Sequence, residues 1–94
     1  MKEIIAPITA ASATKKLHIN SDRYVSVGAD NLAGAEEVTF DVNMGGNWEP
    51  LAPAVKLDAS TNVIQLAGPN TYRINKDATA GACGVYACGD FSAH

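Results

Sequence analysis

Residues that could act as nucleophiles or bases are few in this chain of 94 residues, and their spacing suggests no catalytic group. Nucleophilic catalysis needs a serine, cysteine or threonine activated by a base, most often a histidine. The two histidines are His18 and His94. His18 lies between two apolar residues and is expected on the solvent side of a strand. His94 is the last residue of the sequence and is expected to be frayed. The sequence therefore predicts no enzyme.

Metal ligands are also scarce. Two cysteines and two histidines lack the paired spacing of a zinc site. The acidic and amide side chains between Asp30 and Asn43 offer oxygen ligands, but no loop has the ligand order of a calcium motif. The glycines form no phosphate-binding loop before a helix and are interpreted as turn residues. We therefore predict no catalytic residue, no metal site and no cofactor.

Cys83 and Cys88 lie in one short segment with strand character. If this segment is a single strand, the two side chains point to opposite faces and the Cα atoms lie ~17 Å apart. A disulfide needs a Cα separation of about 5.5–6 Å. We therefore expect two separate buried thiols, as in proteins made in a reducing compartment. Only a tight turn at Gly84 would allow a disulfide.

Two aromatic residues have specific expected roles. Trp48, the only tryptophan, could stack on a sugar or anchor a protein contact. It could instead close the core beneath a hairpin, and we favour this second interpretation. Tyr72 is expected to turn its ring inward and to pair its hydroxyl with the backbone, as tyrosines near strand entries do in sandwich domains.

The elements that position these residues are predicted to be β-strands. In residues 37–43 apolar and polar residues alternate, which indicates a half-buried antiparallel strand. The Gly45-Gly46 pair that follows accepts the positive φ values of a tight hairpin. The return strand contains Pro50 and is followed by Pro53, so it is expected to be an edge or irregular strand.

Weaker alternation predicts further strands, separated by turn residues. They are expected at residues 15–19, 23–27, 54–57, 62–66, 71–75 and 82–87. No segment has a helical pattern with caps, and only residues 31–37 could hold one turn of helix. Short strands at this spacing predict an all-β fold, namely a small antiparallel β-sandwich or small barrel of about seven to eight short strands.

Composition limits the core and the classes of partner. The hydrophobic fraction is 47%, but much of it is alanine, which contributes little transfer free energy. Small domains of this kind commonly gain stability by association. The net charge is −3 and the basic residues are dispersed, so no basic patch for nucleic acid is visible. No apolar run approaches the roughly 18–20 residues of a membrane span. We therefore expect neither a nucleic-acid nor a membrane partner.

The chain is interpreted as one domain with two flanking segments. The apolar start is too short and too interrupted for a signal peptide. Residues 1–13 are instead predicted to form an extended N-terminal arm that adds to a neighbouring molecule. Residues 14–88 are predicted to form the β-sandwich domain, and residues 89–94 a short C-terminal tail.

Four runs carry a resemblance to a known class of proteins. They are LAGAEEV (32–38), GGNWEPL (45–51), LAGPNTYR (66–73) and KDATAGACGV (76–85). Over roughly residues 14–88 the chain resembles small virion proteins encoded near the capsid genes of tailed bacteriophages. The resemblance implies a β-sandwich module that decorates or cements the head, or attaches to the neck or tail, and it supplies no catalytic residues. The chain departs from it at Cys83, at Cys88 and in residues 89–94.

The resemblance and the thin core together predict a homo-oligomeric head decoration protein, located in the virion and assembled in the host cytoplasm. Its expected partners are its own copies and the major capsid protein or another virion protein. The predicted protein contacts are Ile4, Ile5 and Ile8 in the arm, together with Trp48. The alternative is a head, neck or tail appendage that binds a host receptor or a glycan, with Trp48 as a contact.

Overall fold

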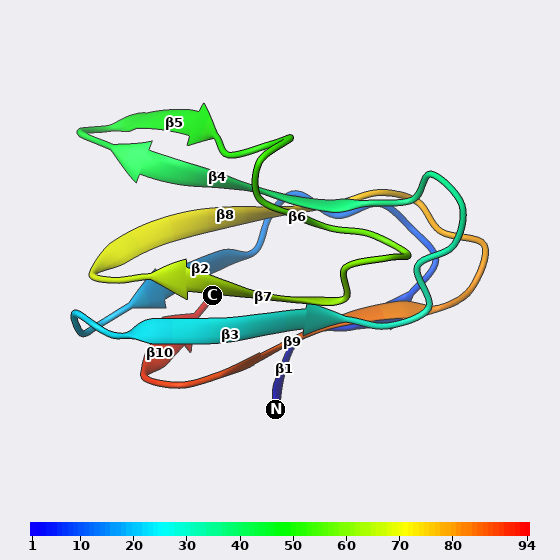
Figure 1. The fold of residues 1–94 in the computed structure, drawn as a ribbon, viewed down its shortest axis with the longest axis horizontal. Coiled ribbons are helices and arrows are strands. Elements are labelled where there is room, and N and C mark those ends of the chain that lie inside the picture. Colours follow the sequence, from blue (N-terminus) through cyan, green and yellow to red (C-terminus); the bar gives the residue numbers. More distant parts are fainter.

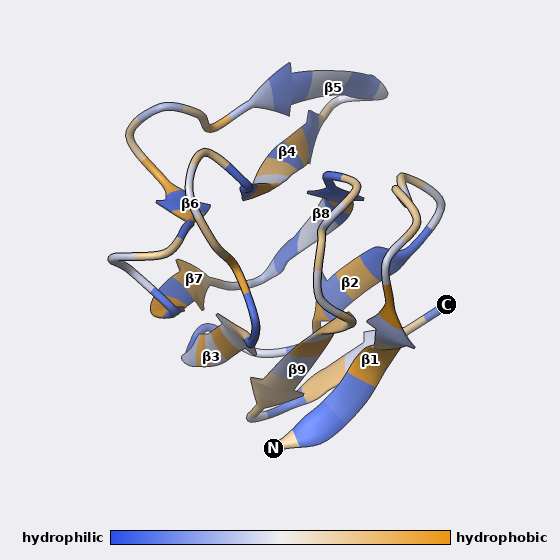
Figure 2. Ribbon diagram, turned by 90° about the vertical axis from the view of Figure 1, so that its right-hand side faces the viewer, coloured by the Kyte–Doolittle hydropathy of each residue, from blue (hydrophilic) through white to orange (hydrophobic).

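The computed structural model describes residues 1–94 and contains ten β-strands and no helix. Two antiparallel sheets pack face to face as a sandwich (Figures 1 and 2). The predicted all-β sandwich is therefore confirmed. It has more strands than the seven to eight predicted, because each end of the chain contributes a strand to a sheet.

The smaller sheet has four strands in the order β1-β9-β3-β7. Their bounds are β1 (Lys2–Ile8), β9 (Cys83–Cys88), β3 (Tyr24–Ala29) and β7 (Val63–Ala67). The larger sheet has six strands in the order β10-β2-β8-β4-β5, and β6 also pairs with β4. Their bounds are β10 (Phe91–Ala93), β2 (Lys16–Ile19), β8 (Asn70–Lys76), β4 (Val38–Met44), β5 (Asn47–Pro50) and β6 (Lys56–Leu57).

The core lies between the two sheets and consists of the apolar residues that alternate along each strand. Phe40, Leu17 and Ile74 of the larger sheet are fully buried, as are Val27 and Val85 of the smaller one. This burial agrees with period-two alternation, in which every second side chain faces the opposite sheet. Figure 2 shows the resulting change between apolar and polar segments along the strands.

Tyr72 has the role that the sequence predicts. It is buried, and its hydroxyl donates a hydrogen bond of 2.6 Å to the carbonyl oxygen of Ala67. Burial raises the pKa of this hydroxyl, although hydrogen bonds from Asn70 and to Ala67 act in the opposite direction. The bond joins β8 of one sheet to the end of β7 in the other, so it fixes how the two sheets connect at this turn.

The β4–β5 hairpin turns at Gly45 and Gly46, as predicted. Their φ angles are 64° and 100°, values that side chains disfavour and glycine accepts. The two-residue loop fixes the register, so that Met44 pairs with Asn47, and Asn43 pairs with Trp48. The predicted edge position of the return strand is confirmed, because β5 pairs with β4 alone.

The N-terminal segment is not a free arm, so this prediction is wrong. Residues 2–8 form β1, which pairs with β9 of the same chain (Figure 1). Ile4 and Ile5 are buried in the core. Register shifts between Glu3 and Ile5 and between Ile5 and Ile8 explain how two adjacent isoleucines both lose contact with solvent. Such bulges place an extra residue in one strand and break the alternation.

The residues after β1 are also fixed to the domain. The main chain of Ser12 exchanges two hydrogen bonds with that of Lys76, at 3.0 and 2.7 Å. The Lys76 ammonium group is buried and donates to the carbonyl oxygens of Ala10 and Asp77. The acceptors offset the cost of removing the Lys76 charge from water.

The C-terminal tail and the single helical turn also differ from expectation. Residues 91–93 form β10, which pairs with β2, and Phe91 packs against the core. The main chains of Lys16 and His94 exchange hydrogen bonds of 3.0 and 3.1 Å, which fix the last residue. Residues 31–37 contain turns but no helix. The sandwich therefore includes the two segments that the sequence analysis placed outside it.

The two cysteines are free, on opposite faces of β9 as expected. Cys83 faces the core and is fully buried, and burial raises the pKa of its thiol. Cys88 is exposed, so the expectation that both thiols are buried is wrong. It lies five positions after Cys83, and an odd spacing within a strand reverses the face.

Candidate binding surfaces

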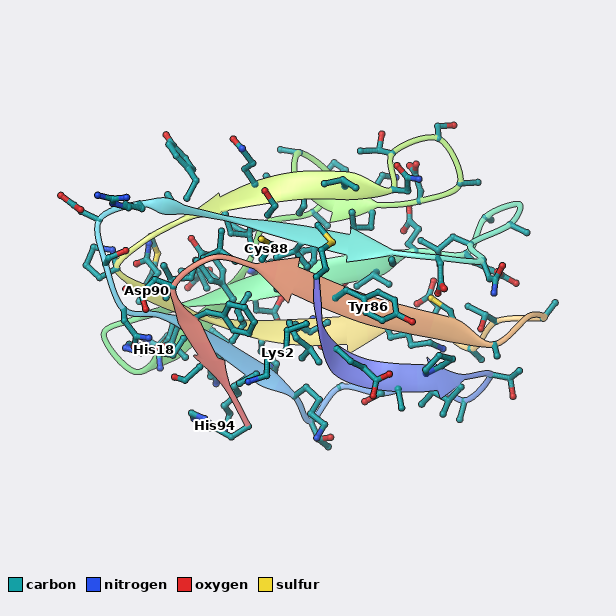
Figure 3. The ribbon with its side chains drawn as sticks, turned by 90° about the horizontal axis from the view of Figure 1, so that it is seen from below. Lys2, His18, Tyr86, Cys88, Asp90 and His94 are labelled. Carbon is teal, nitrogen blue, oxygen red and sulfur yellow. The ribbon has the colours of Figure 1, made fainter.

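The groups that could do chemistry are not brought together. Figure 3 shows Lys2 on β1, Tyr86 and Cys88 on β9, and His94 after β10. His18 is half-buried on the outer side of β2, where its Nδ1 atom lies 2.7 Å from Oγ1 of Thr71. No group of three His, Cys, Asp or Glu side chains could hold a metal ion.

The predicted contact residues separate into two groups. Ile4 and Ile5 are core residues, and Ile8 at the end of β1 is 37% exposed. Trp48 is half-buried and lies outside the core cluster, so the core interpretation of this residue is wrong. Trp48 pairs with Asn43, whose side chain is exposed on β4, and the shared register places both on the outer side of the larger sheet.

The outer side of the larger sheet is rich in charged and hydrogen-bonding groups, and we call it the polar face. Along each strand these side chains alternate with buried core residues or pair across the sheet with residues that do, so they point outward. They are Lys16, His18, Thr39, Asp41, Asn43, Trp48, Lys56, Thr71, Arg73, Asn75 and Ser92. Lys56 also forms ion pairs with Glu37 and with Asp58.

A network around Asp41 forms the centre of the polar face. The Oδ2 atom of Asp41 accepts hydrogen bonds from Nε and Nη2 of Arg73, at 3.0 and 2.7 Å, and from Nδ2 of Asn75 at 3.0 Å. The hydrogen bond from Asn75, together with the charge and donors of Arg73, lowers the pKa of this carboxyl. The Arg73 guanidinium lies 5.0 Å from the centre of the Trp48 ring, within the range of a cation–π contact.

The outer side of the smaller sheet has a different composition, and we call it the neutral face. Its strands direct these residues outward: Glu3 on β1; Tyr24, Ser26 and Gly28 on β3; Val63, Gln65 and Ala67 on β7; and Gly84, Tyr86 and Cys88 on β9. Glu3, on an edge strand, is the only charged residue among them. The neutral face includes two of the most exposed large apolar side chains, Tyr24 at 66% and Val63 at 51%.

Two glycines of the neutral face leave room for neighbouring side chains. Gly28 lies on β3, between β7 and β9. The sulfur atom of Met1 lies 3.5 Å from the position that a Cβ atom of residue 28 would take. Gly84 leaves room for the Tyr86 ring, because a Cβ at this position would overlap the ring. The Tyr86 side chain therefore lies along β9 instead of projecting away from the sheet. A nearly uncharged sheet face is suited to contact with another protein surface.

Two hollows flank the sandwich, one at each side. A hollow of about 360 Å³ lies between the segment before β6 and strand β7, and Val55, Ile64 and Gln65 contribute to its wall. A hollow of about 370 Å³ lies between β1, the end of β9 and β10, next to Met1 and Cys88. The first is also lined by the ion pair of Lys56 and Asp58, and the second by Lys2.

No helix in the structure has the length and apolar character needed to cross a membrane. Comparisons with models of protein families, with curated proteins and with solved structures found no match to this chain.

Sequence reasoning missed two features of these surfaces, and for each a signal was present. A two-residue Gly-Gly loop fixes which residues pair across a hairpin, and this register already places Trp48 beside the polar Asn43. The neutral face had a weaker signal, since its outward residues alternate with core residues in strands that are distant in sequence. It becomes visible only when β1, β9, β3 and β7 are known to be neighbours.

Proposed function

We propose that the chain is a non-enzymatic virion structural protein that decorates or cements an assembled phage capsid, by binding the shell and by associating with its own copies. The observation that carries the proposal is the difference between the two faces of the sandwich. The polar face carries the charged network around Asp41, whereas the neutral face has one charged residue, Glu3, at its edge. The resemblance to tailed-phage virion proteins supplies the partner class.

In this proposal the neutral face lies against the shell, and the polar face remains in solvent. Burial of Tyr24 and Val63, both more than half exposed, would contribute free energy of binding without the cost of removing charges from water. The free thiols fit assembly in the reducing host cytoplasm, and the mature protein is then located in the virion. The proposed partner in the shell is the major capsid protein or another virion protein.

The proposal is tested by sedimentation of the protein with undecorated shells of its phage. The wild type should bind to saturation at a fixed stoichiometry. Ser26→Lys places a charge in the middle of the neutral face and should weaken binding at least tenfold, or about 1.4 kcal/mol. Ser92→Lys makes the same change on the polar face and should leave binding intact. A wild type that does not sediment with shells, or equal binding by the two variants, would contradict the proposal.

A second candidate function follows from the position of Trp48. An indole ring on the outside of a sheet, beside the donors and acceptors of Arg73, Asp41 and Asn75, is an arrangement that can hold a sugar ring. This favours an appendage that binds a host receptor or glycan. Because Trp48 is the only tryptophan, its fluorescence during titration with cell-surface glycans reports this binding directly. An unchanged emission with every glycan would exclude the sugar.

A further inference from the structure

The two sheets have free edges, and most of these carry features that prevent strand pairing. Strand β1 carries Lys2, Glu3 and Pro7 and has two register shifts. Strand β5 contains Glu49 and Pro50, and β10 has three residues. Charges, prolines, bulges and shortness are the means by which proteins block unwanted pairing at sheet edges.

Strand β7 lacks these features. Its sequence, Val63-Ile64-Gln65-Leu66-Ala67, contains no charge, no proline and no glycine, and its register with β3 is continuous. It pairs with β3 on one side and with no strand of its sheet on the other. An uncharged, regular edge strand of this kind is competent to pair with another strand.

The hydrogen-bond pattern identifies which main-chain groups of β7 are free. The Ala29 amide donates to the carbonyl of Asn62, and the Gly68 amide donates to that of Arg23. Hydrogen-bonded pairs alternate along an antiparallel ladder, so the N–H and C=O groups of Ile64 and Leu66 point toward β3. The N–H and C=O groups of Val63, Gln65 and Ala67 therefore point away from the sheet. The Ala67 carbonyl oxygen already accepts a hydrogen bond from the Tyr72 hydroxyl, which confirms that this carbonyl points away from β3.

We infer that β7 pairs in antiparallel orientation with β7 of a second copy of this chain, about a twofold axis at Gln65. This inference deepens the proposed association between copies and rests on that part of the proposed function. In this register Gln65 lies opposite Gln65 of the second copy, and Val63 lies opposite Ala67. Gln65 then exchanges two main-chain hydrogen bonds with Gln65 of the second copy, and the Ala67 amide meets the Val63 carbonyl, whereas the Ala67 carbonyl stays with Tyr72 and Asn70.

A second copy fits this edge better than a charged partner would. Strand β7 itself has no charge, and the charged residues that line the hollow beside it, Lys56 and Asp58, form an ion pair. On the inner side, Ile64, which is half-buried, lies opposite Leu66 of the second copy. Pairing also covers Ile64 and Gln65, which line the hollow of about 360 Å³ beside this edge. The twofold axis of an antiparallel pair is perpendicular to the sheet, so the two neutral faces form one continuous surface.

Charge at position 65 tests the pairing, because this residue is opposite itself. By analytical ultracentrifugation at low salt, the wild type should sediment as a dimer of the 9.8 kDa chain. Gln65→Lys should weaken dimerisation at least tenfold, as should Gln65→Glu, since like charges then face each other. An equimolar mixture of the two variants should restore the dimer. Ser92→Lys, on the other sheet, should remain dimeric.

A crosslink tests the register. Directly opposite residues of a hydrogen-bonded pair have Cα atoms about 5.5 Å apart, which suits a disulfide. In a Cys88→Ser background, Gln65→Cys should form a disulfide-linked dimer on mild oxidation. Val63→Cys should not, because its partner in this register is Ala67. A monomeric wild type across a dilution series, a dimer that persists in Gln65→Lys, or equal crosslinking of both variants would overturn the inference.

The two proposals fail separately. A wild type that binds shells but stays monomeric contradicts the β7 pairing and leaves the shell-binding part of the proposed function intact. A dimer that dissociates with Gln65→Lys but never binds shells supports the pairing and contradicts shell decoration.

Discussion

Asp41 shows how a carboxylate is kept on a strand next to core residues. Its flanking residues, Phe40 and Val42, are buried, and Asp41 itself is largely covered. A carboxylate removed from water is costly unless it is paired. Three donors from Arg73 and Asn75 meet one of its oxygens, and charge-assisted bonds of this kind are stronger than neutral ones.

Asp41→Asn should therefore lower the free energy of unfolding by about 1–3 kcal/mol at neutral pH. The native pKa lies below the ordinary value of 3.8, so the carboxylate stabilises the fold above that pH. This contribution is lost as the pH falls through the native pKa. Urea unfolding between neutral pH and about pH 2 should show the difference between wild type and variant shrinking toward acid. Asp22→Asn, at an exposed carboxylate, is the control, and a pH-independent difference for Asp41→Asn would contradict the account.

The two thiols should differ in reactivity by their burial alone. Cys88 is exposed, whereas Cys83 is buried and burial raises the pKa of its thiol. Thiolate is the reactive form, so the native protein should take up iodoacetamide at Cys88 only. Both cysteines lie on the tryptic peptide 77–94, so fragmentation of this peptide by mass spectrometry locates the label, with urea-unfolded protein as the control in which both cysteines react. Rapid alkylation of Cys83 in the native state would mean that β9 is not packed as described.

Strands with clear alternation could be predicted, and strands without it could not. Residues 37–43 were placed within one residue of β4, because Val38, Phe40 and Val42 face one core. In β1 the bulges put Ile4 and Ile5 side by side in the core, so the segment has no period of two. Strand β10 has three residues, which is too short for any period. Its pairing with β2 depends on residues distant in sequence.

Two isoleucines of β1 test whether this strand is part of the fold. Ile5 is 4% exposed and Ile8 is 37% exposed. Ile5→Ala should cost about 2–5 kcal/mol of unfolding free energy, because it leaves a cavity in the core. Ile8→Ala should cost less than about 1 kcal/mol. Chemical denaturation measures both. Equal small effects would indicate that residues 1–8 are a free arm after all.

At the scale of the whole molecule, the sandwich has a polar face, a neutral face and one unprotected edge. The two faces could not be read from composition, because each gathers outward residues from strands far apart in the chain. The thin core predicts association, which stays a prediction, and the sequence does not show which edge is free to associate. Edge β7 was identified only from its neighbours and from the direction of its main-chain groups.

Dimerisation through β7 should couple stability to concentration. A partner that binds only the folded state raises the apparent melting temperature as its concentration rises. The Tm of the wild type should therefore increase over a dilution series followed by circular dichroism, and the Tm of Gln65→Lys should stay constant. Ser92→Lys should behave as the wild type does. A wild-type Tm that does not depend on concentration would contradict the coupling.

The two chain ends lie on the side of the sandwich opposite β7, since β1 and β10 are the far edges of their sheets (Figure 2). A fluorescent protein or an enzyme joined to the C-terminus would project from that side. Cargo attached there would leave both the paired edges and the neutral face unobstructed, whereas cargo before Met1 would not, because Met1 lies against Gly28 of the neutral face. Each dimer could then carry two attached domains, one on each copy at the side away from β7. The dimer would therefore be suited to the display of foreign domains.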